Sequence, residues 1–202
     1  MELIVKDLGL CDYNEALLSQ ENTRSQLIKN SGKNTLFLLE HNHTYTLGKN
    51  GNPNNILNKN CELFQTDRGG DVTYHGPGQL VGYPIINLKT MGLGIRSYVS
   101  NIEQLLIDVL YDYGINASIK QGLTGVWIED RKIASIGIRV SQWITTHGFA
   151  LNVNTDMNYF SNIISCGIDN VSMTSMEKEL NKKISISDVK QSTINHFNDI
   201  FK

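Results

Sequence analysis

The stretch Arg68-Gly69-Gly70-Asp71-Val72-Thr73-Tyr74-His75-Gly76-Pro77-Gly78-Gln79-Leu80-Val81-Gly82-Tyr83-Pro84 is the most informative part of this chain. Glycine occupies five of its positions: Gly69, Gly70, Gly76, Gly78 and Gly82. Glycine lets backbone approach a ligand closely and adopts positive φ without penalty, but it weakens a strand. Two interpretations are open. The stretch is either two turns around a β-strand at 71–75 or a substrate groove walled by backbone.

The composition indicates one globular domain spanning residues 1–202, because 40% of the residues are hydrophobic and can form a core. Lys+Arg 18 against Asp+Glu 20 gives a net charge of -2, which argues against a nucleic-acid partner. The 3 cysteines are far apart and odd in number, which does not suggest a disulfide framework. They form no C-x-x-C pair, so thiolate zinc ligation is not expected either.

The N-terminus shows no basic region followed by an apolar run. No apolar segment approaches the roughly 20 residues that a membrane span needs. We therefore expect a reduced, cytoplasmic, soluble protein with no membrane partner.

Hydrophobic periodicity predicts three helices. The first begins at a capping box of Asp12 and Glu15 and reaches about Asn30, with apolar residues near both ends and a polar middle. The second runs from about Ile95 to Tyr113, with Ile102, Leu106 and Val109 on its apolar face. The last runs from Ser187, as N-cap, to about Phe201.

Strands are predicted at residues 3–5 and 35–40, and at 149–153, where apolar residues alternate. Residues 125–129 and 132–140 flank a turn at Asp130-Arg131, which predicts a β-hairpin. Residues 49–60 are rich in Asn, Gly and Lys and indicate a surface loop. Because hairpins imply antiparallel pairing, the fold class expected is α+β, with a mixed or antiparallel sheet covered by helices.

The stretch 68–84 resembles the signature R-G-G-x-V-T-Y-H-G-P-G-Q-L-V-x-Y of the octanoyltransferases of lipoate biosynthesis. Further matching segments follow in the order of that family, and the resemblance covers about residues 12–174. They are Tyr45–Gly48, Gly125–Ile128, Lys132–Gly137, His147–Asn152 and Cys166–Ile168. The resemblance implies the fold shared by biotin and lipoate protein ligases. Ser165 departs from the family, which usually has proline there, and proline would fix φ before the cysteine.

Cys166 and Lys132 are the catalytic residues that the resemblance implies. On residue type alone, Cys166 is either a small buried side chain or a nucleophile, and Lys132 is an ordinary lysine near a turn. In the family, the cysteine is the nucleophile and the lysine lowers its pKa, since a nearby ammonium stabilises a thiolate. A lysine could also accept the proton of an incoming amine. Cys11 and Cys61 match no motif and are interpreted as structural.

The resemblance also implies a set of substrate-binding residues. They are Arg68, Gly69, Gly70, Asp71, Val72, Thr73, Tyr74, His75, Ser135, Ile136, Gly137, Gly148, Phe149 and Ala150. Asp71 occupies the variable signature position, so we expect no chemistry from it. Arg68 could anchor a loop through several hydrogen bonds. Trp127 and Phe149 are expected to fill the core, although an acyl chain also needs apolar walls.

Five histidines divide into two groups. His75 and His147 lie in matched motifs beside glycines, and the resemblance makes them pocket residues. His41, His43 and His196 are interpreted as packed or surface residues. No spacing suggests metal ligation, so neither a metal nor an organic cofactor is expected.

The function expected is transfer of an octanoyl group from acyl carrier protein to a lysine of a lipoyl domain, through an acyl-enzyme on Cys166. The acceptors implied are the lipoyl domains of 2-oxoacid dehydrogenases and the glycine cleavage H protein. Backbone N–H groups near Gly167 and in the turn 76–78 are candidate oxyanion donors. We expect Gly78→Val to reduce activity more than stability. Three alternatives stay open: an ATP-dependent lipoate or biotin protein ligase, a cysteine thioesterase using His75 or His147, and an inactive acyl-binding module.

Overall fold

The computed structural model describes residues 3–58, 62–164 and 171–201 of the chain. Over these residues the main sheet has eight strands in the order β1-β2-β6-β10-β9-β8-β7, with β11 beside the start of β9. The strands are β1 (Ile4–Cys11), β2 (Thr35–His41), β6 (Gln79–Ile85), β7 (Ser118–Lys120), β8 (Leu123–Ile128), β9 (Arg131–Ser141), β10 (Ile144–Asn152) and β11 (Ser172–Met173). β1 is parallel to β2 and β11 to β9, while the other neighbours are antiparallel. The mixed sheet is therefore as predicted.

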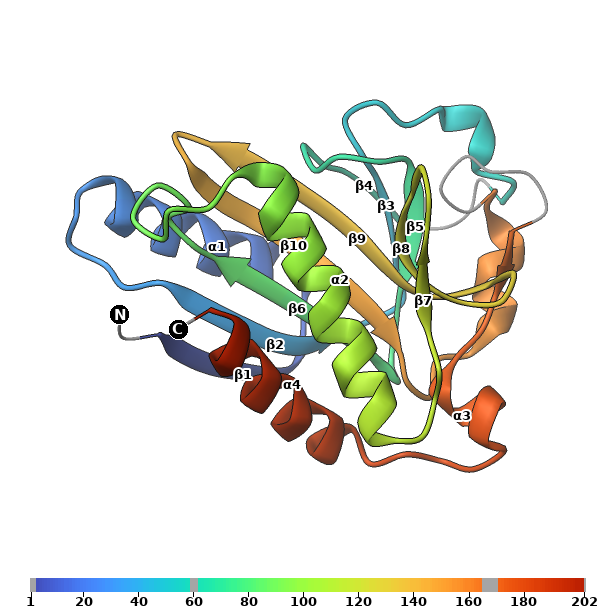
Figure 1. Ribbon diagram of the computed structural model, residues 1–202. Helices are drawn as coiled ribbons and strands as arrows, with labels where there is room; N and C mark the ends of the chain where they lie inside the picture. The colour runs from blue at the N-terminus through green and yellow to red at the C-terminus, as the bar shows by residue number, and fades with distance from the viewer. Residues whose placement is uncertain (1–2, 59–61, 165–170, 202) are drawn as a thin grey trace.

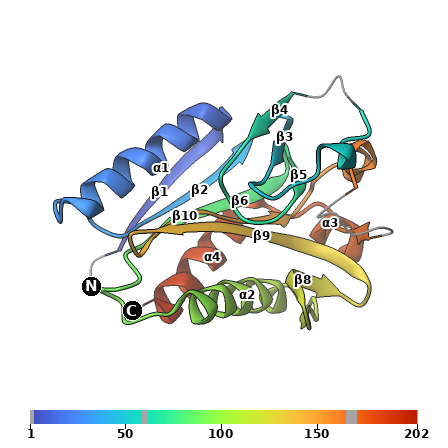
Figure 2. The same cartoon turned by 90° about the horizontal axis from the view of Figure 1, so that it is seen from above.

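A second sheet of three strands lies over one face of the main sheet (Figure 2). It consists of β3 (Thr44–Leu47), β4 (Leu63–Gln65) and β5 (Val72–His75), in the order β4-β3-β5. Only β5 was expected from the sequence, as the strand-like segment between the glycines. The chain between β4 and β5 carries Arg68 and the glycine pair, so this loop lies where the two sheets meet.

Helices cover both faces of the main sheet (Figures 1 and 2). α1 (Tyr13–Ile28) lies on the same side as the small sheet, and α2 (Ile95–Asp112) and α4 (Ile186–Ile200) lie side by side on the other. Shorter segments are α3 (Met176–Leu180) and the 3-10 turns η1 (Pro53–Asn55) and η2 (Met157–Asn162). The loop predicted at 49–60 contains η1. No helix among the described residues is long and apolar enough to cross a membrane.

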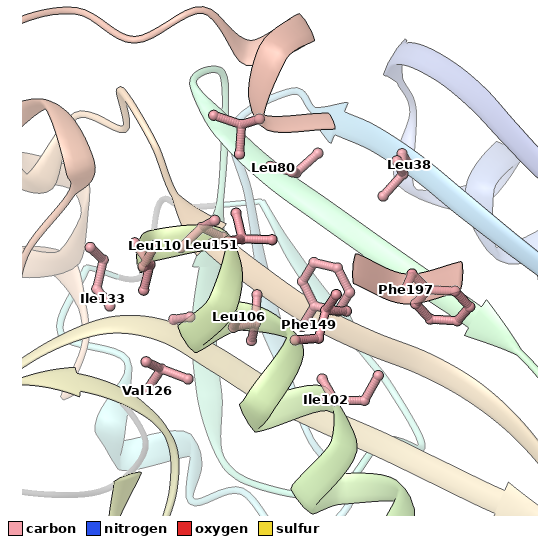
Figure 3. Close-up of a cluster of buried hydrophobic side chains, with 14 of the residues drawn as sticks. Leu38, Leu80, Ile102, Leu106, Leu110, Val126, Ile133, Phe149, Leu151 and Phe197 are labelled. Atoms are coloured by element: carbon pink, nitrogen blue, oxygen red, sulfur yellow. The ribbon is translucent and has the colours of Figure 1, made fainter. Parts of the chain in front are cut away.

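The largest hydrophobic cluster lies between the main sheet and the pair α2 and α4, as Figure 3 shows. Phe149 of β10 points into it, together with Leu106 of α2 and Phe197 of α4. The core role expected for Phe149 is confirmed, since only 2% of its surface is exposed. On α2, Ile102, Leu106 and Val109 are buried as predicted. Ile95 is the exception: it starts the helix and is 48% exposed.

Helix α1 begins as predicted, with Asp12 as its N-cap accepting from the backbone of Asn14. Its buried face differs from the apolar pattern. Ile28 is 40% exposed, whereas Gln20 and Thr23 in the polar middle are buried. The polar middle of this helix therefore faces the protein interior.

Several predicted boundaries are wrong. The strand predicted at residues 3–5 extends to Cys11. The hairpin turn is Glu129-Asp130 rather than Asp130-Arg131, because Glu129 adopts a left-handed φ of 51° and Arg131 already belongs to β9. The N-cap of α4 is Ser185, whose hydroxyl accepts from the Asp188 backbone, and not Ser187. Strand β10 begins at Ile144, five residues before the prediction. Its first half contains buried threonines and a histidine, which hid the alternating pattern.

Candidate active site

A cavity of about 230 Å³ lies between the two sheets and the N-terminal end of α1. Of the residues predicted from the sequence, its walls contain Lys132, Arg68, Gly69, Gly70, Asp71, Val72, Thr73, His75, Ser135, Ile136, Gly137, His147, Gly148, Phe149 and Ala150. Five further lining residues were not proposed as site residues: Tyr13, Tyr83, Gly122, Leu123 and Thr124. Tyr83 is the last residue of the matched family signature, and this position was the signal that could have identified it.

Glycines form part of this wall: Gly137 of β9 and Gly148 of β10 line it, together with Gly69 and Gly70 of the loop before β5. Gly148 pairs with Gly137, and a Cβ on Gly148 would lie 2.1 Å from the carbonyl oxygen of Gly82. The loop before β5 sits directly on β9, where Gly69 donates to the Ile138 carbonyl at 2.9 Å. A side chain at Gly148 would collide with β6, and one at Gly137 would press on Arg68 and Gly69 of the loop.

Arg68 anchors the loop from within, as the sequence suggested. It is 8% exposed, and its Nη2 donates to the carbonyl and hydroxyl of Thr46 at 2.7 and 2.8 Å. Its Nη1 donates to the Gly69 carbonyl at 3.0 Å. Thr46 belongs to β3, so Arg68 fixes the loop to the small sheet.

Asp71 lines the cavity, but its carboxylate binds protein groups. It accepts hydrogen bonds from the Asn55 side chain at 2.7 Å and from the backbone of Asn52 and Val72. These bonds hold the segment around η1 against the start of β5. The arrangement agrees with the expectation that Asp71 takes no part in chemistry.

His75 is a neutral imidazole in the cavity wall. Burial lowers its pKa to about 3, and His41 nearby acts in the same direction. Gln79 donates to the Tyr74 carbonyl and to Asn152, so its Oε1 is left to accept from Nδ1 of His75 at 2.8 Å. The unprotonated nitrogen of His75 is then Nε2. Such a ring can accept a hydrogen bond but carries no charge near neutral pH.

His147 is held at both its backbone and its ring. Its φ of 58° is left-handed, and its backbone N–H donates to Oε1 of the buried Gln20 at 2.7 Å. Its Nε2 donates to Asp67 at 2.8 Å, and Asp67 also pairs with Arg139 at 2.6 Å. Burial lowers the pKa of His147, while the hydrogen bond to Asp67 opposes the shift. His147 therefore connects α1, β10 and the loop before β5.

Tyr13 and Tyr83 add polar aromatic rings to the wall. Tyr13 is 3% exposed, and burial raises its pKa to about 12. His41 donates from Nδ1 to the Cys11 carbonyl and accepts from the Tyr83 hydroxyl, each at 2.8 Å. His41 is therefore a packed residue, as predicted. His43 and His196 lie nearer the surface, bonded to Tyr74 and Asp112 respectively.

Tyr74 does not line the cavity, unlike its neighbours in β5. Alternate side chains of a strand point to opposite faces. Its ring packs in the cluster between the small sheet and η2, stacked at 4.9 Å on Tyr159, and its hydroxyl bonds to His43. The structure thus separates Tyr74 from the other predicted substrate-binding residues.

The turn 76–78 also lies away from the cavity. The Gly78 N–H donates to Glu40 at 2.7 Å, and the Gly78 carbonyl accepts from Asn154 at 2.8 Å. A Cβ on Gly78, whose φ is 82°, would lie 2.5 Å from the Asn154 carbonyl oxygen. The expectation that this turn borders the pocket is wrong. Its N–H is already used within the fold, so Gly78 is not an oxyanion donor.

Lys132 lies in the cavity wall and is 3% exposed. Cys166 and the flanking Ser165 and Gly167 fall outside the described residues. The chain on either side of residues 165–170 is placed: the Ile164 backbone donates to Asn55 at 2.8 Å, and Met173 of β11 pairs with Lys132.

Among the described residues no three side chains of His, Cys, Asp or Glu are grouped as metal ligands. Cys11 is buried, and burial raises its thiol pKa, while Cys61 is outside the described residues.

Comparison with known proteins identifies the family of this site. Residues 12–198 match the family described as lipoyl protein ligase A/B catalytic domain. An octanoyltransferase of Pelobacter propionicus is 43% identical over 195 residues, covering 96% of this chain and 93% of that protein. A crystal structure of lipoate-protein ligase A bound with ATP superposes with a TM-score of 0.75 at 15% identity, covering 99% of this chain and 85% of that one.

A more distant likeness extends to biotin protein ligase from Aquifex aeolicus, with a TM-score of 0.56 at 13% identity over 98% of this chain and 68% of that one. At such identities the solved structures show the fold alone, and they confirm the fold expected from the sequence. The relatives at more than 40% identity define the family more narrowly. This chain belongs to the octanoyltransferase family, within the lipoyl protein ligase A/B catalytic domains.

Proposed function

We propose that this protein transfers an octanoyl group from acyl carrier protein to a lysine of a lipoyl domain, through an acyl-enzyme on Cys166. The observation that carries the proposal is the burial of the Lys132 side chain in the wall of a cavity that several glycines also line. A buried ammonium is costly, and its position beside a cavity is typical of a group that acts on a bound reactant.

The size of the cavity supports a medium-length acyl chain. Liquid water occupies about 30 Å³ per molecule, and a methylene group is of similar size. A cavity of about 230 Å³ therefore has room for a medium-length acyl chain.

In the proposed reaction, the Cys166 thiolate attacks the thioester carbon of the octanoyl donor. The carbon–sulfur bond to the carrier breaks, and the carrier's thiol leaves after taking up a proton. The amine of the acceptor lysine then attacks the new thioester on Cys166, loses a proton and expels the thiolate. The products are an octanoyl amide and free enzyme, and the reaction consumes no oxidant, reductant or ATP.

Lys132 has two roles in this scheme. Its ammonium favours the thiolate of Cys166, and after losing a proton it can accept one from the incoming amine. The position of Lys132 supports the scheme through the segment that contains Cys166, since β11 returns from it to pair with Lys132. His75 and His147 are proposed as neutral wall residues rather than bases, because burial lowers the pKa of both.

The test is a three-component reaction with octanoyl acyl carrier protein, an apo lipoyl domain and no ATP, followed by intact-mass analysis of the acceptor. The proposal requires the acceptor to gain one octanoyl group. Transfer that occurs only from free octanoate with ATP would identify a ligase. Release of octanoate at the same rate with or without the acceptor would identify a thioesterase. Both results would refute the proposed function.

The cell compartment proposed is the cytoplasm, where thiols stay reduced. The acceptors proposed are the lipoyl domains of 2-oxoacid dehydrogenases and the glycine cleavage H protein. Each acceptor can be tested separately in the same reaction.

A further inference from the structure

Trp127 is buried but does not belong to the hydrophobic clusters of the described residues. It lies on β8, the strand between β7 and β9, and is 2% exposed. Two lysines approach its ring: Nζ of Lys120 lies 5.0 Å and Nζ of Lys132 5.2 Å from the centroid. No described residue accepts a hydrogen bond from its indole N–H. Trp127 is thus buried, as expected from the sequence, and its ring also contacts two ammonium groups.

The two lysines are not equivalent. Lys120 forms a 2.5 Å ion pair with Asp130, and 29% of its side chain is exposed. Lys132 is 3% exposed and lies directly opposite Trp127 in the register of β8 and β9. The attraction between a cation and a ring face is strongest where the cation is removed from water. The cation–π attraction of the Trp127 ring is therefore expected to be stronger for Lys132 than for Lys120.

Gly125 adds an independent observation on the same side chain. A Cβ on Gly125 would lie 2.6 Å from Cε and 3.2 Å from Nζ of Lys132, and also 2.6 Å from the carbonyl oxygen of Ala134. Its φ is 124°, and its N–H donates to Glu103 of α2 at 3.2 Å. The register of β8 and β9 shifts just beyond it, between Val126 and Trp127. The Lys132 side chain thus lies in the space that a side chain at position 125 would occupy.

We propose that Gly125 and Trp127 are positioning residues that fix the ammonium of Lys132 in the wall of the acyl cavity. Gly125 leaves room for the aliphatic part of the Lys132 side chain, and the indole face attracts the charged end. The Lys132 backbone is fixed independently by β8, β9 and β11, where its carbonyl accepts from Thr174 at 3.0 Å. The inference rests on the proposed function, in which Lys132 acts beside Cys166.

The test compares the pH dependence of Cys166 alkylation, read from the mass of the Cys166 peptide after iodoacetamide treatment. The variants are Trp127→Leu, Trp127→Phe and Gly125→Ala. We expect Trp127→Leu and Gly125→Ala to move the alkylation midpoint upward by about half a pH unit or more, because the cation is no longer held near the thiol. Trp127→Phe keeps a ring face and is expected to lie between wild type and Trp127→Leu.

Matched controls exist for both positions. Trp143→Leu makes the same change at a tryptophan that is 51% exposed. Gly114→Ala places a side chain at another glycine of positive φ, where no atom lies within 4 Å of the new Cβ. Both controls are expected to keep the wild-type profile. Thermal midpoints recorded for every variant separate a loss of stability from a change at the thiol.

The Lys132→Met variant separates this inference from the proposed function. If Lys132→Met leaves the profile of Cys166 unchanged, the pairing of the two residues is wrong, and with it this part of the proposed function. If Lys132→Met shifts the profile but Trp127→Phe, Trp127→Leu and Gly125→Ala do not, only the positioning role is overturned. When Trp127 acts through the lysine, adding Trp127→Phe or Trp127→Leu to Lys132→Met causes no further shift. Equal shifts in both backgrounds would overturn the inference.

Discussion

His147 donates a hydrogen bond from Nε2 to Oδ1 of Asp67 at 2.8 Å and so ties β10 to the loop that carries Arg68. The side chain of His147 is 2% exposed, whereas that of Asp67 is 50% exposed. Asp67 also forms an ion pair with Arg139. Because the donor is buried and the acceptor is exposed, the two partners respond differently to substitution.

Asp67→Ala leaves the buried N–H of His147 without an acceptor, so we expect a loss of about 1–3 kcal/mol in the free energy of unfolding. Asp67→Asn keeps an oxygen in place and is expected to lose less. Arg139→Gln removes only the exposed ion pair and is expected to cost less than about 1 kcal/mol. Urea denaturation measures all three. Equal losses for Asp67→Ala and Arg139→Gln would show that the bond to His147 contributes nothing.

The stability of the protein is expected to fall as the pH is lowered from 6.5 towards 5. Burial lowers the pKa of His41, His75 and His147 in the folded protein, that of His75 to about 3. In the unfolded chain these rings bind protons near pH 6.5, so acid favours unfolding. Each ring that stays neutral adds up to about 1.4 kcal/mol per pH unit to the slope.

The check is denaturant unfolding at several pH values for wild type and His75→Asn. We expect the variant to show a smaller slope between pH 6.5 and 5, since one of the three rings is removed. Carboxylates with lowered pKa, such as Asp7 and Glu179, contribute in the same direction but mainly below this window. A slope unchanged by His75→Asn would show that this ring is charged in the folded protein.

Gly78→Ala is expected to destabilise the protein with little effect on turnover per folded molecule. The new Cβ would lie 2.5 Å from the Asn154 carbonyl oxygen at a φ of 82°, and the turn lies outside the acyl cavity. Left-handed strain alone costs about 1–3 kcal/mol, and the contact with Asn154 adds to it. Gly92→Ala is the control, because its φ is also positive and nothing lies within 4 Å. Comparable thermal midpoints for the two variants would contradict this assignment.

Substitutions of Lys132 separate its two proposed roles. Lys132→Met is expected to slow acyl-enzyme formation by removing the cation that favours the thiolate. Lys132→Arg keeps the charge but cannot readily accept a proton, so we expect the acyl-enzyme to form and then accumulate. Single-turnover mass analysis follows both steps. Deacylation by the amine at the wild-type rate in Lys132→Arg would exclude the base role.

Local patterns predicted much of this fold. Local sequence preferences predicted the N-cap at Asp12, the helix around Leu106 and the hairpin of β8 and β9. The structure contains all three. The small sheet was missed because β4 has three residues and pairs in parallel with β3, so neither length nor a hairpin turn marks it. The burial of Gln20 was also missed, since its partner His147 is 127 residues away.

The candidate site, too, could be predicted only in part from the sequence. The glycine-rich stretch predicted a wall of backbone, and the cavity has one. The direction of individual side chains depended on tertiary contacts: Tyr74 faces the aromatic cluster, and the turn at Gly78 binds Glu40 and Asn154. The contacts of Lys132 with Gly125 and Trp127 occur beside a register shift in β8 and β9, which the sequence pattern did not predict.

Whether octanoate becomes covalently attached to Cys166 tests the central proposal most directly. The enzyme is mixed with octanoyl acyl carrier protein in the absence of an acceptor, and peptide mass analysis locates any adduct. We predict one octanoyl group on Cys166, its loss on addition of an apo lipoyl domain, and no adduct in a folded Cys166→Ser variant that has lost nearly all transfer. An adduct on Cys11 or Cys61, or full transfer by Cys166→Ser, would contradict the account.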